Sequence, residues 1–158
     1  MRAIVIDDSP TMRAMIKNHL NKLGWTVVGE GENGVEALEL VRTLRPDFMT
    51  LDIIMPEMDG IECYRHVRQL EQPPRCLIIS VLASEPRVIA AYEGEIFSTH
   101  FLKKPYSEKE LKERIDLVLS TDPMPFPILH EIGDGSTPKA EEAIPASMPE
   151  LPPLPLDN

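Results

Sequence analysis

Five short aliphatic segments alternate with stretches of helical periodicity over the first 120 residues, and this alternation limits the possible folds more than any other feature. Strands are expected at residues 2–7, 26–30, 47–52, 76–80 and 100–103. Aliphatic runs separated by helices are typical of parallel strands that are buried on both faces. The pattern therefore predicts a parallel sheet with helices packed on each side.

Capping residues mark the ends of the predicted helices. Ser9 suits the N-cap of the first helix, Pro10 its first position and Gly24 its end. Ser107 and Glu110 have the spacing of a capping box for the last helix. Strands that alternate with helices in this number predict an α/β fold of the flavodoxin-like doubly wound class. Its five-stranded parallel sheet has the order 2-1-3-4-5 and binds ligands at the carboxyl ends of the strands.

The composition changes near residue 120. Nine of the 16 prolines fall within residues 121–158, which also hold seven acidic residues and one lysine. Frequent proline, few β-branched residues and a net negative charge oppose a packed core. We therefore expect a folded domain over residues 1–120 and a disordered, acidic tail or linker over residues 121–158. The apolar side chains of "PMPFPILHEI" leave open that this part of the tail is a recognition segment.

Charge and hydropathy exclude several classes of function. The net charge is −10 and there is no basic run, so binding to nucleic acid or to an anionic membrane is not expected. No apolar run approaches the roughly 20 residues that cross a bilayer, and the N-terminus lacks the pattern of a secretory signal. We expect a cytoplasmic protein in which Cys63 and Cys76 are reduced and structural.

Three acidic residues and one lysine stand at the ends of predicted strands. Asp7 and Asp8 close the first strand, Asp52 closes the third, and Lys104 follows the fifth. The carboxyl ends of parallel strands share one edge of a sheet, and carboxylate oxygens suit Mg²⁺. A single aspartate there is more often a turn or capping residue, but the four together predict a Mg²⁺ and phosphoryl site. Asp52 is the expected nucleophile, because it lies between the acidic pair and the lysine in strand order.

Four motifs in this order resemble the receiver domain of two-component response regulators, particularly the chemotaxis-type regulators that consist of a single domain. They are "VIDDSPTMR", "TLDIIMPEMDG", the strand-end serine of "LIISV", and "LKKPYS". The match spans residues 1 to about 120. The resemblance implies a signalling switch that accepts a phosphoryl group from a sensor histidine kinase or a phosphotransfer protein, and then changes its affinity for a downstream protein.

The resemblance also implies a role for each residue of the site. Asp52 is the phospho-acceptor, and Asp8 and Asp52 bind Mg²⁺ directly together with the backbone carbonyl of Ile54. Asp7 reaches the metal through water, and Lys104 pairs with the phosphoryl group.

Three further positions are implied to support the switch. Ser80 hydrogen-bonds a phosphoryl oxygen and draws in the loop that follows it, and Phe101 stands at the position of the switching aromatic residue. Pro105 follows the lysine through a cis peptide bond. Taken alone, Ser80 would be read as a loop hydroxyl and Phe101 as a core residue.

The chain departs from the common receiver pattern near the acceptor. Ile54 and Leu82 occupy positions that often carry polar groups able to orient an attacking water, and Val81 narrows the access. We therefore predict slow self-dephosphorylation. The segment 84–100 is longer than usual, so the fourth helix is expected to be short or displaced, which affects the identity of the partner more than the phosphorylation.

Other functions remain open at this point. The chain could be a scaffold that works without phosphorylation, or the receiver part of a longer regulator whose output domain follows the proline-rich segment. A metal-dependent phosphatase or dehalogenase-like hydrolase also attacks through an aspartate at a strand end. Such a hydrolase needs a second acid two residues after the nucleophile, where this chain has Ile54.

Overall fold

The structure, a computed structural model, describes residues 1–91 and 96–121. Apart from Thr121, the tail expected from the sequence lies outside the described residues. The predicted disorder of that tail and the recognition segment within it therefore stay predictions.

Five parallel strands form one sheet in the order β2-β1-β3-β4-β5, which confirms the flavodoxin-like topology. The strands are β1 (Arg2–Ile6), β2 (Thr26–Gly31), β3 (Phe48–Leu51), β4 (Arg75–Ser80) and β5 (Phe101–Lys103). In the neighbouring strands β1 and β3, Ile6 pairs with Leu51. Their next residues, Asp7 and Asp52, therefore emerge at the same level of the carboxyl edge.

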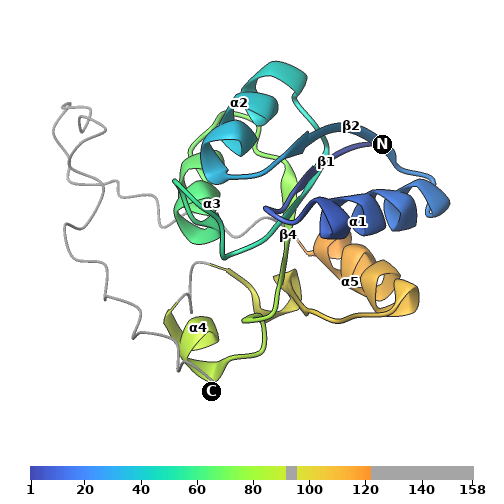
Figure 1. The fold of residues 1–158 in the computed structure, drawn as a ribbon, viewed down its shortest axis with the longest axis vertical. Coiled ribbons are helices and arrows are strands. Elements are labelled where there is room, and N and C mark those ends of the chain that lie inside the picture. The colour runs from blue at the N-terminus through green and yellow to red at the C-terminus, as the bar shows by residue number, and fades with distance from the viewer. Residues whose placement is uncertain (92–95, 122–158) are drawn as a thin grey trace, which may run out of the picture. The chain divides into compact units, whose positions relative to one another are not determined.

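Helices cover both faces of the sheet (Figure 1). The helices α1 (Pro10–Lys22) and α5 (Glu108–Ser120) pack on one face, and α2 (Gly34–Leu44) and α3 (Gly60–Arg68) pack on the other. A short 3₁₀ turn, η1 (Ser98–His100), leads into β5. The helix α4 is described over Pro86–Ala91, and residues 92–95 lie outside the described part. The prediction of an altered fourth helix therefore stays open.

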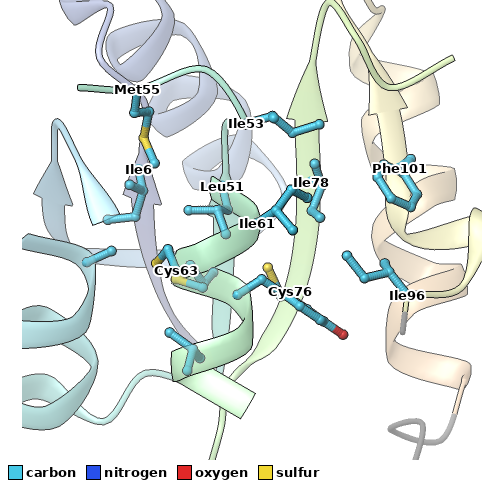
Figure 2. Close-up of a cluster of buried hydrophobic side chains, with 14 of the residues drawn as sticks. Ile6, Leu51, Ile53, Met55, Ile61, Cys63, Cys76, Ile78, Ile96 and Phe101 are labelled. Atoms are coloured by element: carbon cyan, nitrogen blue, oxygen red, sulfur yellow. The ribbon is translucent and has the colours of Figure 1, made fainter. Parts of the chain in front are cut away.

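Each face of the sheet has its own hydrophobic core. One core joins α2 and α3 to the sheet, and Figure 2 shows its centre, where Leu51, Ile61, Ile78 and Phe101 lie among the strands and α3. The other core lies under α1 and α5. Because successive strand residues point to opposite faces, the two cores use alternate positions of the same strands. The central strands are thus buried on both sides and hold the carboxyl edge in place.

The helix caps follow the sequence. Ser9 Oγ accepts the Met12 N–H at 3.3 Å, and Pro10 opens α1. The capping box of α5 is formed in both directions between Ser107 and Glu110. None of the helices within residues 1–91 and 96–121 combines the length and the apolar character that a membrane span requires.

Candidate functional site

Acidic side chains meet at the carboxyl edge of the sheet, as the strand ends predicted. Asp7 and Asp8 follow β1 and Asp52 follows β3, and one carboxylate oxygen of each lies within 4.8 Å of the others. Asp7 and Asp52 are buried, whereas Asp8 is exposed. Like charges this close repel one another unless a cation lies nearby. The cluster is therefore open to solvent on the side of Asp8 and attracts cations.

Lys104 supplies one such cation. Its Nζ donates to Oδ2 of Asp7 at 2.6 Å and to Oδ2 of Asp52 at 3.0 Å. The backbone N–H of Lys104 donates to the carbonyl of Ser80 at 3.1 Å, which extends the β4–β5 pairing to this residue. The lysine therefore reaches from the edge strand across the end of β4 to the two buried acids.

Burial and charge act against each other in this group. Burial raises the pKa of Asp52, and the negative charge of Asp7 adds to the rise, while Lys104 and the Ser80 hydroxyl oppose it. Burial works to lower the pKa of Lys104, but its hydrogen bonds to Asp7 and Asp52 outweigh that effect and leave the pKa raised. The ammonium of Lys104 therefore stays charged, but its single positive charge does not fully offset the cost of burying the carboxylate of Asp52.

Ser80 lies at the end of β4, next to Asp52. Its side chain is fully buried, and Oγ accepts the backbone N–H of Leu82 at 3.3 Å. The hydroxyl proton can therefore be offered to a group bound at Asp52, while Oγ holds the loop that follows the strand. A change in the partner of this hydroxyl would act directly on residues 81–85.

The remaining predicted residues have different surroundings. Phe101 is buried in the core of the α3 face, near Ile78 and Ile96 (Figure 2). The Lys104–Pro105 peptide bond is cis. Ile54 follows Asp52 by two residues and is 43% exposed. The role of its carbonyl as a metal ligand stays a prediction.

Two residues that contact the site were not singled out from the sequence. Gly60 opens α3 against the backbone of Asp52, and its N–H donates to the Ile53 carbonyl at 2.8 Å. Arg13, on the first turns of α1, donates to the Asp7 carbonyl at 2.6 Å. The sequence offered a signal for each residue. Gly60 is the glycine of "MDG", and Arg13 stands one helical turn after Ser9, where a helical side chain points back toward the N-terminus and the acidic loop.

The donor set fits a hard divalent cation. Three carboxylates against one ammonium leave the cluster negative, and the exposed Asp8 offers oxygen ligands to solvent. Mg²⁺ prefers oxygen ligands and retains water molecules, which an edge of this kind accommodates better than a closed cage. Asp8 and Asp52 would hold such an ion, and Asp7 stands beside them, tied to Lys104.

Comparisons with known proteins agree with this geometry. A sequence model of the response regulator receiver domain matches residues 3–116. The chemotaxis protein CheY of Bacillus subtilis is 36% identical over 119 residues, which make up 75% of this chain and 98% of the relative. The chain belongs to the response regulator receiver family.

Other relatives place this receiver among those of two-component signalling. CheY of Thermotoga maritima is 32% identical over 117 residues, which are 74% of this chain and 96% of the relative. The crystal structure of the response regulator domain of Thermotoga maritima CheB superposes with a TM-score of 0.66 at 31% identity, and covers 78% of this chain and 98% of that one. Receivers bind Mg²⁺ at an acidic cluster, and the aspartates of this receiver form such a cluster.

Proposed function

We propose that this receiver is a phosphorylation-dependent signalling switch. It accepts a phosphoryl group on Asp52 from the phosphohistidine of a sensor histidine kinase or a phosphotransfer protein, and it then changes its affinity for a downstream protein. The observation that carries this proposal is the position of Lys104, whose ammonium contacts both Asp7 and Asp52 beside the exposed Asp8. The proposal is supported by a buried carboxylate, a lysine ammonium bonded to it and an exposed acid, which all lie at the carboxyl edge of the sheet.

The chemistry assigned to Asp52 is a displacement at phosphorus. One carboxylate oxygen forms a P–O bond while the P–N bond of the donor breaks, and the departing imidazole takes the electron pair and afterwards a proton. Catalysis of such transfers rests on positioning and on neutralising the phosphoryl oxygens. Lys104 is within reach to pair with these oxygens, since its Nζ already lies 3.0 Å from Oδ2 of Asp52. Bound Mg²⁺ supplies the remaining positive charge there.

Ser80 and Phe101 are the residues we assign to the conformational response. Ser80 would turn its hydroxyl toward a phosphoryl oxygen and weaken its 3.3 Å contact with the Leu82 N–H. That change would draw the following loop toward the acceptor. Phe101 belongs to the same hydrophobic core as Leu82 and Ala83 of that loop. A shift of the loop would therefore change the packing around Phe101. The output is then a change in protein binding, with no DNA contact by this acidic domain.

The chain catalyses only transfer to itself and is not an enzyme with a separate substrate. The phosphorylated state is proposed to be long-lived, because the exposed Ile54 and the half-buried Leu82 provide no polar group to orient water beside Asp52. The net charge of −10, the lack of a basic run in the sequence and the resemblance to chemotaxis-type regulators support a cytoplasmic protein that exchanges signals with other proteins.

The test is phosphorylation of the full chain by acetyl phosphate with Mg²⁺, followed by intact-mass measurement. We expect one added phosphoryl group in the wild type and none in Asp52→Asn. Hydroxylamine should remove it, because it cleaves an acyl phosphate and leaves a phosphoserine intact. The same reaction with EDTA should give no modification. Modification of Asp52→Asn at the wild-type rate would reject Asp52 as the acceptor, and an unmodified wild type would favour a scaffold that works without phosphorylation.

A further inference from the structure

A largely buried arginine lies directly behind the acidic loop. Arg13 donates from Nη1 to the Asp7 carbonyl at 2.6 Å and from Nη2 to Glu32 Oε1 at 3.3 Å, and its Nε lies 3.9 Å from Glu30 Oε1. Only 13% of its side chain is exposed. A guanidinium with this many fixed partners is held in one orientation, which a flexible surface arginine would not be.

We propose that Arg13 is a positioning residue for the metal-binding loop, and that it sets the Mg²⁺ affinity of the receiver through the peptide that joins Asp7 to Asp8. This inference rests on the proposed function, because it assumes that Asp8 is a metal ligand. Arg13 donates to a backbone carbonyl and not to a carboxylate of the cluster. It therefore acts on the geometry of the site without competing for the ligand oxygens.

The argument begins with the planar peptide bond. The carbonyl oxygen of Asp7 and the N–H of Asp8 belong to one rigid unit, so rotation about the Cα–C bond of Asp7 moves that oxygen and Asp8 together. The N–H of Asp7 is already fixed by the Gly31 carbonyl at 3.0 Å, and its Oδ1 accepts the Ser9 N–H at 2.9 Å. The bond from Arg13 to the Asp7 carbonyl restrains rotation about the Cα–C bond of Asp7. It thereby limits the directions in which the exposed Asp8 carboxylate is presented.

The surrounding charges make this arrangement compatible with a bound cation. An unpaired guanidinium so near the cluster would repel Mg²⁺, but Glu30 and Glu32 at the end of β2 offset its charge. Lys17, one turn further along α1, donates to Glu30 at 3.0 Å and has no bond to the acidic loop within the described residues. Arg13 thus connects the end of β2 to the loop after β1, while Lys17 bonds to Glu30 of β2.

The experiment compares Mg²⁺ binding to the full chain by isothermal titration calorimetry for the wild type, Arg13→Met and Lys17→Met. Both substitutions remove one positive charge from the same helix and one partner from Glu30. We expect Arg13→Met to weaken Mg²⁺ binding by about tenfold or more, as loss of a residue that orients a ligand does elsewhere. Lys17→Met should change it by less than about twofold, since an exposed charge is screened.

Thermal unfolding of each variant separates a positioning role from a purely structural one. A structural role alone would lower the melting temperature of Arg13→Met and leave its Mg²⁺ affinity unchanged well below that temperature, which would overturn the proposal. Should the methionine variant fail to fold, Arg13→Lys decides. A Mg²⁺ affinity of Arg13→Lys roughly threefold or more below that of the wild type would support the proposal, because one ammonium cannot replace the several N–H donors of the planar guanidinium. A Mg²⁺ affinity equal to that of the wild type would overturn the proposal. A wild type that binds no Mg²⁺ would overturn the inference together with the metal site itself.

Discussion

Lys104 places its ammonium nitrogen 3.0 Å from Oδ2 of Asp52, across the end of the intervening strand β4. The same nitrogen lies 2.6 Å from Oδ2 of Asp7, so one cation serves two buried carboxylates. Burial still raises the pKa of Asp52 in the presence of this cation. The unmodified site is therefore electrostatically unfavourable, and both Mg²⁺ binding and loss of the Asp52 charge should stabilise the fold.

Asp52→Asn should raise the free energy of unfolding by about 1 kcal/mol at pH 7 without Mg²⁺. Asparagine keeps the acceptor for the Ile53 N–H, which now lies 2.7 Å from Oδ1, and Lys104 keeps its bond to Asp7. The wild type should match the variant below the ordinary pKa of 3.8 and lose stability relative to it as the pH rises through the raised pKa of Asp52. Urea unfolding in EDTA measures the difference. The exposed Asp116→Asn is the control, and a less stable Asp52→Asn would contradict the reasoning.

Gly60→Ala should lower both stability and the rate of phosphorylation. A Cβ at this position would overlap the carbonyl oxygen of Asp52 and lie 2.8 Å from its carbonyl carbon, so the backbone of Asp52 must move. We expect a loss of about 2–3 kcal/mol in urea unfolding and slower modification by acetyl phosphate. Gly24→Ala is the control: Gly24 has φ 86° and no atom near the added Cβ, so it should cost about 1 kcal/mol and leave the phosphorylation rate unchanged. Equal phosphorylation rates in both variants would contradict the proposed contact.

The buried His100 should make stability depend on pH below neutrality. Burial, with Arg68 and Arg75 nearby, lowers the pKa of His100 from 6.5 to about 4. Between these values the unfolded chain takes up a proton that the folded chain does not, so stability falls as the pH drops from 6.5 to 4. His100→Asn should remove up to about 3 kcal/mol of this pH dependence. Unfolding followed at several pH values tests it, with the half-buried His66→Asn as the control. Parallel curves for the wild type and His100→Asn would refute the assignment.

Ile54→Asn should shorten the lifetime of the phosphorylated receiver roughly tenfold, because an amide near Asp52 can orient an attacking water. Ile54 is 43% exposed, so the substitution needs no rearrangement of the core. Decay of the phosphorylated mass after removal of acetyl phosphate gives the rate. Leu117→Asn on α5 is matched in exposure, at 42%, and should leave the lifetime unchanged. An unaltered lifetime in Ile54→Asn would count against the explanation for slow dephosphorylation.

Much of the fold was predictable because its determinants are local in the chain. Aliphatic runs and helical periodicity recur within single elements, and Ser9 and Ser107 cap the helices that follow them. The alternation of strands and helices is typical of doubly wound folds, in which the carboxyl ends of the parallel strands share one edge of the sheet. Asp7, Asp8 and Asp52 could therefore be grouped before any distance was known.

What the sequence by itself determined was thus the sheet order and the membership of the acidic cluster. Only the tertiary structure decided that Asp7 and Asp52 are buried while Asp8 is open to solvent, that Lys104 bonds to both buried acids, and that Gly60 touches the backbone of Asp52. It also revealed the bond from Arg13 to the Asp7 carbonyl. The physical reason is that periodicity and capping act between near neighbours in the chain. Burial and side-chain contacts, by contrast, depend on how distant elements pack, and a single-residue pattern does not encode those distances.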